Sequence, residues 1–225
     1  MKYLQRNFLF RFYFSRNDAE QILILCCLFS VGLMTFRVVY TGHLLFVFLV
    51  WNLFLAFVPY AISKNMSNAL VKSKWKFFLS ALVWLLFIPN SFYIITDLFH
   101  LDMNEDAPLW YDLALLLSFA WNGLLFGILS VRQMEKVFEN NFNKKLGMLF
   151  ILPLMALNGF GVYIGRYLRF NSWDVVTSPF QLISDMVYLF IHPICNRFDW
   201  SMIVCYAILL LLIYYTMKKL SKALQ

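Results

Sequence analysis

The sequence predicts an all-α fold: a polytopic membrane helix bundle of about six transmembrane helices, with a short amphipathic helix on the outer side. Three observations favour it: the chain is unusually apolar, its apolar stretches are long, and its charges divide between alternate loops. Of 225 residues, 62% are hydrophobic and 14% are charged, whereas soluble domains average about 25% charged residues. This length leaves no room for a large soluble domain, so we expect a single integral membrane domain over residues 1–225.

Six apolar stretches approach the length of about 20 residues that a helix needs to cross the hydrocarbon core. They are residues 21–40, 42–62, 77–98, 110–130, 146–168 and 199–217. A very short turn at Thr41 and Gly42 joins the first two, which predicts a tight helical hairpin. The basic, aromatic-rich segment before the first stretch is interpreted as an uncleaved interfacial segment, because no small-x-small cleavage site follows it.

If six spans cross the membrane in alternating directions, the loops on its two sides carry very different charges. Through the positive-inside bias, this difference predicts which side of the membrane each loop faces. Fifteen of the 19 lysines and arginines fall on one side, in the N-terminal segment, loops 63–76 and 131–147, and the C-terminal tail. The other side carries only Arg37, Arg166, Arg169 and Arg197, against eight acids: Asp97, Asp102, Glu105, Asp106, Asp112, Asp174, Asp185 and Asp199. Both termini should therefore be cytoplasmic. The net charge of +7 is a topology signal, and no nucleic-acid partner is needed to explain it.

Residues 178–192 resist assignment as a span. Ser178 and Pro179 form a good helix start, and polar side chains then recur on one face. They are Gln181, Ser184, Asp185, Tyr188 and His192. This pattern predicts an amphipathic helix at the outer interface, and a re-entrant segment is the alternative.

Each of four spans carries one asparagine near its middle, at Asn52, Asn90, Asn122 and Asn158. One interpretation is hydrogen bonding between helices, and the other is a polar cleft that opens outward. Pro89 favours the cleft, because its ring removes a backbone donor and frees a carbonyl one turn earlier. Broken helices beside polar residues are how transporters often build binding sites.

Two glycine pairs have the small-xxx-small spacing that lets helices approach closely. Gly123 and Gly127 form the first pair, and Gly161 and Gly165 form the second. We expect them to bring the fourth and fifth spans together.

The outer end of the third span is the densest polar region of the chain. Asn90, Tyr93, Asp97 and His100 recur at spacings that place them on one face of one α-helix. Asp112 begins the next span nearby. Ionisable residues at such depth make a functional site the default hypothesis.

The end of the fifth span supplies further candidate ligand-binding residues: Arg166, Arg169, Asn171, Trp173 and Asp174. Arg166 and Arg169 share a helical face, so both guanidinium groups can point into one pocket. Two outer arginines oppose the charge bias and therefore need partners. Internal pairing with Asp97, Asp112 or Asp174 is one interpretation, and an anion clamp for a phosphate or carboxylate is the other.

Asp97 and His100 are the candidate catalytic residues, one helical turn apart. With His192 or Asp112 they could ligate a metal or act as an acid–base pair. The alternative is a hydrogen-bonded interfacial pair without chemistry. The chain has no HExxH motif and no second DxxH motif, so the metal and any cofactor stay unknown.

Several of these segments together resemble an uncharacterised bacterial multi-pass membrane family, domain of unknown function 1361. They are residues 87–101 (FIPNSFYIITDLFHL), 110–112 (WYD), 118–123 (SFAWNG) and 161–174 (GVYIGRYLRFNSWD). The resemblance covers most of residues 40–215 and implies a bacterial inner-membrane location. It implies no activity, substrate or cofactor.

Three functions stay open at this point. The first is a binding protein or transporter for an anionic or lipid-linked solute, although no internal repeat relates the two halves. The second is an enzyme acting on a lipid-linked phosphate at the outer leaflet. The third is a structural or assembly partner of a membrane complex, with protein partners unknown. We place the first ahead of the second by a small margin.

Overall fold

The computed structural model describes residues 17–66, 73–101, 106–141, 144–170 and 173–223, and over these residues it contains helices and no strand. The basic N-terminal segment and Asn171 lie outside them. Five helical stretches are long and apolar enough to cross a membrane: Asp18–Thr41, Lys74–His100, Leu109–Asn141, Leu149–Arg166 and Arg197–Ala223. The protein is therefore a multi-pass, all-α membrane protein, and the sequence prediction of this class is confirmed.

Helix α2 (Asp18–Thr41) begins at a capped end and stops at a glycine. The Asn17 side chain accepts a hydrogen bond from the backbone N–H of Glu20 at 2.9 Å, which satisfies an otherwise unpaired donor. Gly42 adopts φ 72°, the left-handed conformation that ends many helices. The first predicted span is thus confirmed at both ends to within a few residues.

Helix α3 (Phe48–Lys64) starts six residues later than the predicted second span, because residues 43–47 reverse the chain after Gly42. Its 17 residues rise about 26 Å at 1.5 Å per residue, slightly less than a typical hydrocarbon core. Helix α3 packs against both α5 and α6. That α3 forms a sixth span stays a prediction.

The third span is α-helical only in its first part. Helix α5 (Lys74–Tyr93) contains Pro89 and then tightens into the 3₁₀ helix η2 (Ile94–His100). The Thr96 hydroxyl donates to the Tyr93 carbonyl at 2.7 Å across this junction. The single α-helical face predicted for Asn90, Tyr93, Asp97 and His100 therefore ends at Tyr93.

Helix α6 (Leu109–Asn141) is longer than the predicted fourth span and includes most of the predicted loop 131–147. Its extra turns are held by polar contacts. Glu135, fully buried, accepts hydrogen bonds from the Tyr214 hydroxyl at 2.7 Å and the Lys218 ammonium at 2.5 Å, and it forms an ion pair with Arg132. These partners remove the penalty of burying the carboxylate and join α6 to α10 (Arg197–Ala223).

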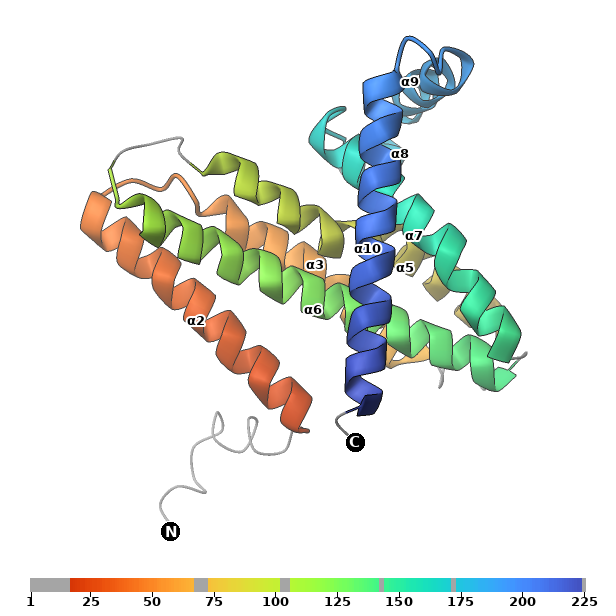
Figure 1. The fold of residues 1–225 in the computed structure, drawn as a ribbon, viewed down its shortest axis with the longest axis horizontal. Helices are drawn as coiled ribbons and strands as arrows, with labels where there is room; N and C mark the ends of the chain where they lie inside the picture. The colour runs from red at the N-terminus through yellow and green to blue at the C-terminus, as the bar shows by residue number, and fades with distance from the viewer. Residues whose placement is uncertain (1–16, 67–72, 102–105, 142–143, 171–172, 224–225) are drawn as a thin grey trace.

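Helix α7 (Lys144–Arg166) packs against α5, α6 and α10. The short helix α8 (Asp174–Thr177) follows, and then α9 (Pro179–Ile191), which has proline in its first turn as predicted. In Figure 1, α9 lies beyond the upper end of α10, and α10 crosses in front of α6. The prediction of a helix here is confirmed, while its interfacial position stays a prediction.

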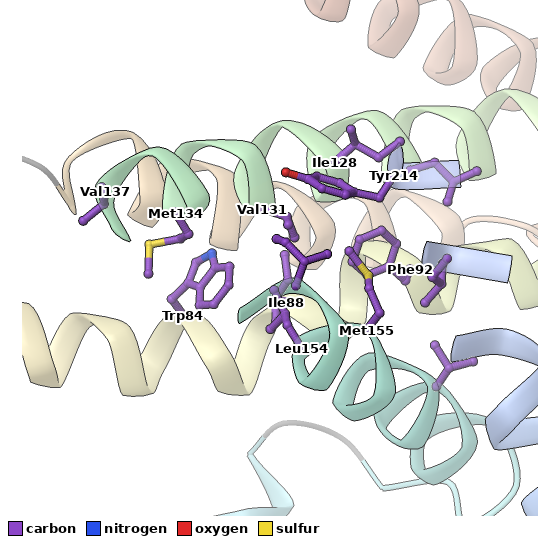
Figure 2. Packing of buried hydrophobic residues seen from close by; sticks show 14 of the residues in the cluster. Trp84, Ile88, Phe92, Ile128, Val131, Met134, Val137, Leu154, Met155 and Tyr214 are labelled. Atoms are coloured by element: carbon purple, nitrogen blue, oxygen red, sulfur yellow. The ribbon is translucent and has the colours of Figure 1, made fainter. Parts of the chain in front are cut away.

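Helix α5 is a central part of the packing, against α3, α6 and α7. Figure 2 shows Trp84, Ile88 and Phe92 of α5 facing Val131 and Met134 of α6, and residues of α7 and α10 close the same cluster. The Trp84 indole N–H donates to the Ser130 hydroxyl at 2.8 Å within this apolar core. The buried indole is therefore both packed and hydrogen-bonded, as buried tryptophans usually are.

Both glycine pairs face this central segment. A Cβ on Gly123 would lie 2.9 Å from the Ser91 carbonyl oxygen, and one on Gly161 would lie 2.6 Å from the Pro89 Cβ. The nearest atoms to Gly127 and Gly165 likewise belong to Phe92 and Tyr93. The prediction that these pairs serve contact between the fourth and fifth spans was wrong, because each helix uses its glycines to approach the third.

Helices α2 and η2 end, and α6 begins, at one end of the bundle, which we call the outer end after the predicted orientation. In Figure 1 the first turn of α2 and the last turn of α10 lie at the lower side of the view. This arrangement agrees with two termini on one side of a membrane. Which side that is stays a prediction from the charge distribution.

Candidate functional site

Asp97 lies at the outer end of the bundle, in η2, and is 1% exposed. Its Oδ2 accepts a hydrogen bond from the Asn52 side-chain N–H of α3 at 2.8 Å. Its Oδ1 has no hydrogen-bond partner among the described residues. A buried carboxylate oxygen without a donor is costly, so this oxygen marks a place that can accept a hydrogen bond from something else.

The described contacts of the His100 ring are with the Asp97 backbone and with Phe48. Its Nδ1 lies 3.1 Å from the Asp97 backbone oxygen, and its ring packs against Phe48 with 5.1 Å between centroids. That hydrogen bond requires the proton on Nδ1. The predicted pairing of the two side chains as acid and base is not assembled in this conformation.

Arg166 is the last residue of α7 and lies close to the same region. Its guanidinium carbon is 5.1 Å from the centre of the Phe99 ring, and it is near enough to Asp97 and His100 to interact with both electrostatically. Over the described part of the chain, no carboxylate forms a salt bridge with it. The guanidinium therefore keeps donors that an anion could use.

Arg169 does not share a helical face with Arg166. The helix ends at Arg166, the Phe170 N–H bonds back to the Ile164 carbonyl at 3.3 Å, and Arg169 adopts φ 58° at an exposed position. This is the left-handed conformation that closes helices. The predicted shared helical face of Arg166 and Arg169 is wrong for this reason, and the convergence of their guanidinium groups in one pocket stays a prediction.

Trp173 and Asp174 lie beyond this turn. The Trp173 ring contacts that of Trp51, with 6.4 Å between centroids, and the Asp174 Oδ1 accepts a hydrogen bond from the Thr177 hydroxyl at 2.9 Å. Trp173 thus links the segment after α7 to α3. The Asp174 contact with Thr177 lies within helix α8.

Asp112 has a partner that sequence reasoning did not assign to it. Arg37 of α2 forms a two-point ion pair with it: Nε to Oδ1 at 2.6 Å and Nη2 to Oδ2 at 2.9 Å. Both side chains are buried, and the Arg37 guanidinium also lies 4.4 Å from the centre of the Phe46 ring. The predicted pairing of Asp112 with Arg166 or Arg169 is wrong, because Arg37 occupies both carboxylate oxygens.

The asparagines divide into two groups. Asn122 donates to the Cys26 carbonyl at 3.2 Å and the Ser30 hydroxyl at 2.8 Å, so it joins α6 to α2 and lies apart from the cleft. Asn90 and Asn158 line a cavity between α5 and α7 instead. Asn158 is fully buried, and its Oδ1 has no hydrogen-bond partner among the described residues.

The cavity between α5 and α7, which we call the α5–α7 cleft, has a volume of about 260 Å³. Its walls are mostly apolar, with Pro89 and Gly161 facing each other, and Leu182 and Met186 of α9 cover it. A smaller cavity of about 70 Å³ shares Asn90, Tyr93, Gly165 and Phe170 with it and adds Asn52. A largely apolar cavity therefore adjoins a small polar one, and Asn52 in the wall of the small cavity donates a hydrogen bond to Asp97.

The metal hypothesis gains no support. No group of three histidine, cysteine, aspartate or glutamate side chains within the described ranges could hold a metal ion. His192, predicted as a third ligand, is exposed and its Nδ1 contacts the Tyr188 carbonyl of its own helix at 3.3 Å.

Two polar features were missed by sequence reasoning. The Arg37–Asp112 pair joins residues 75 positions apart, and no spacing rule predicts such a contact. The Glu135 cluster was assigned to a loop, although Arg132 and Glu135 have the three-residue spacing of a helical ion pair. That spacing was the available signal.

Comparisons with known proteins agree with the sequence resemblance. No curated protein and no solved structure matches the chain. A family model described as "Protein of unknown function (DUF1361)" matches residues 51–213, which include α5, η2, the outer-end carboxylates and Arg166. The chain therefore belongs to the DUF1361 family.

Proposed function

We propose that this protein binds an anionic, lipid-linked solute in the α5–α7 cleft, at the extracytoplasmic face of a bacterial plasma membrane. The observation that carries the proposal is the pairing of an apolar cleft with unsatisfied polar groups at its inner wall and outer end. The bacterial location rests on the family resemblance, and the face rests on the positive-inside bias.

The cleft suits an amphiphilic ligand. Leu157, Phe160 and Leu182 provide an apolar surface, while the Oδ1 of Asn158 needs a hydrogen-bond donor. Ligand pockets are usually apolar with a few placed polar groups that orient the ligand. Hydroxyl or amide groups of the solute would satisfy Asn158, and its lipid chain would lie along the apolar wall.

Arg166 is the proposed anchor for the anionic group. Its chain neighbour Gly165 lines the cleft, and the guanidinium lies over the Phe99 ring of η2, near the outer end. A phosphate or carboxylate there would gain charge-assisted hydrogen bonds worth about 1.5–3 kcal/mol. Tyr93, Asn90 and Asn52 line the smaller cavity, and Asn52 donates a hydrogen bond to Asp97 behind it.

Purification of the full-length protein followed by mass spectrometry of its retained lipids tests the proposal. The wild type should retain a lipid-linked anion, and Arg166→Ala should retain at least about tenfold less of it, from the energy of one charge-assisted contact. Arg197→Ala is the matched control, because Arg197 is exposed and contacts its own neighbour Phe198. Equal retention by both variants would contradict the proposal.

The enzyme alternative is separable by the same method. If Asp97 and His100 perform chemistry, Asp97→Asn and His100→Ala should still retain the lipid-linked species, while cells carrying them accumulate it. If the protein binds the lipid-linked species without converting it, cells carrying Asp97→Asn or His100→Ala should not accumulate that species. Membrane levels of each variant must match the wild type for this comparison.

A further inference from the structure

A second cavity lies on the other side of the bundle, between α2 and α3. This α2–α3 groove has a volume of about 830 Å³ and opens to the side surface of the bundle. Its walls include Leu28, Val31, Phe54 and Phe57, while Glu20, Tyr60, Lys64 and Asn65 make up one end. That end lies where α2 begins and α3 finishes, which is the cytoplasmic side in the predicted orientation.

The groove exists because α2 packs mainly on α6. Among the main contacts between helices in the described chain, α2 takes part only in the one with α6. In Figure 1, α2 diverges from α6 toward its own N-terminal end. An open space therefore remains between α2 and α3.

The side chains along the groove suit a flexible chain better than another helix. Membrane helices pack through small residues that allow close approach, and this protein uses glycines in that way on α6 and α7. The groove instead presents large side chains that are still accessible, such as Leu28 at 63% and Phe54 at 53% exposed. An acyl chain can follow so uneven a surface, because its torsions are free.

The polar end of the groove suits a phosphate. Lys64 forms an ion pair with Glu20, and the Tyr60 hydroxyl donates to the same carboxylate at 3.4 Å. The Lys64 side chain remains 41% exposed, and an ammonium group has three donors. Lys74 and Lys76, exposed in the first turn of α5, add positive charge at the same end of the bundle.

We infer that the α2–α3 groove holds one acyl chain of an anionic glycerophospholipid whose phosphate lies at Lys64. The site is independent of the α5–α7 cleft, since the two cavities share no lining residue. Basic side chains near a bilayer surface attract anionic lipids with about 1 kcal/mol each. A lipid at this site should therefore be selected for an anionic headgroup, whereas bulk lipid that merely contacts the groove should not.

Native mass spectrometry of the full-length protein in detergent, titrated with phosphatidylglycerol or phosphatidylcholine, tests the inference. The wild type should retain one phosphatidylglycerol in preference to phosphatidylcholine. Lys64→Gln should lower that adduct about fivefold, the ratio that corresponds to one basic side chain. Lys219→Gln is the matched control, because Lys219 is exposed on α10 at the same end.

A second pair of variants tests the groove itself. Leu28→Trp should exclude the acyl chain and abolish the adduct, while Leu212→Trp, at an equally exposed position on α10, should leave it unchanged. Equal binding of both lipids, equal behaviour of the two lysine variants, or a protein dimer in place of the lipid adduct would overturn the inference. Arg166→Ala should not alter this adduct, so the inference can fail while the proposed function stands.

Discussion

Two carboxylates are buried at the outer end of the bundle, and their surroundings differ sharply. Asp112 receives two hydrogen bonds from Arg37, and both of its oxygens are used. Asp97 receives one hydrogen bond from the neutral amide of Asn52, and its second oxygen has no partner within the described chain. The first arrangement is a complete structural contact, whereas the second is incomplete without a ligand, a water molecule or a proton. Equal burial therefore does not imply equal roles.

The largest effect is expected from breaking the complete pair. Asp112→Asn would leave the buried Arg37 guanidinium without its anion, which costs about 3–5 kcal/mol in comparable cases. The measurement is thermal unfolding of the purified protein, together with its level in the membrane. Arg37→Met combined with Asp112→Leu removes both charges and should recover most of the loss. If Asp112→Asn alone is as stable as the wild type, the distinction between Asp112 and Asp97 is wrong.

Removing the one hydrogen-bond donor that the described residues supply to the Asp97 carboxylate should have an intermediate effect. Asn52→Leu leaves both carboxylate oxygens buried without a donor, with an expected loss of about 1–3 kcal/mol. The same unfolding measurement applies. Adding Asp97→Leu removes the unsatisfied group and should restore part of the stability. If the double variant is less stable than Asn52→Leu, Asp97 has further structural partners.

Asp97→Asn is the matched counterpart of Asp112→Asn and should change stability by less than about 1 kcal/mol. The new amide oxygen can still accept the Asn52 hydrogen bond, and no buried cation loses an ion pair. Comparing the unfolding temperatures of the two asparagine variants tests the distinction directly. Similar losses in both would mean that Asp97 is as structural as Asp112.

The smallest expected effect concerns Arg169, the arginine that does not reach Asp97. Arg169→Gly should stabilise the protein by about 0.5–1 kcal/mol, because glycine adopts its φ of 58° without strain. Arg169→Ala serves as the control that removes the charge without freeing the backbone. A loss of stability in both variants would show that Arg169 supplies charge to the outer end after all.

Much of the architecture could be predicted from local features. The apolar stretches predict the long helices, Pro179 predicts the start of α9, and Gly42 predicts the end of α2. Local reasoning failed where the backbone changed type. Helical spacing assumes 100° per residue, so the 3₁₀ segment after Tyr93 and the left-handed Arg169 moved their side chains away from the predicted faces.

The sequence by itself determined the class of protein, its family and the location of its unusual polar residues. Hydropathy and charge decide the class and the location of the polar residues, because both are sums over neighbouring residues, and four motifs carry the resemblance to the family. Only the tertiary structure decided that Arg37 pairs with Asp112, that Asn52 reaches Asp97, and that both glycine pairs face α5. These contacts join helices far apart in the chain, and they depend on how each helix is rotated and tilted against its neighbours. Periodicity within one helix carries no information about that rotation.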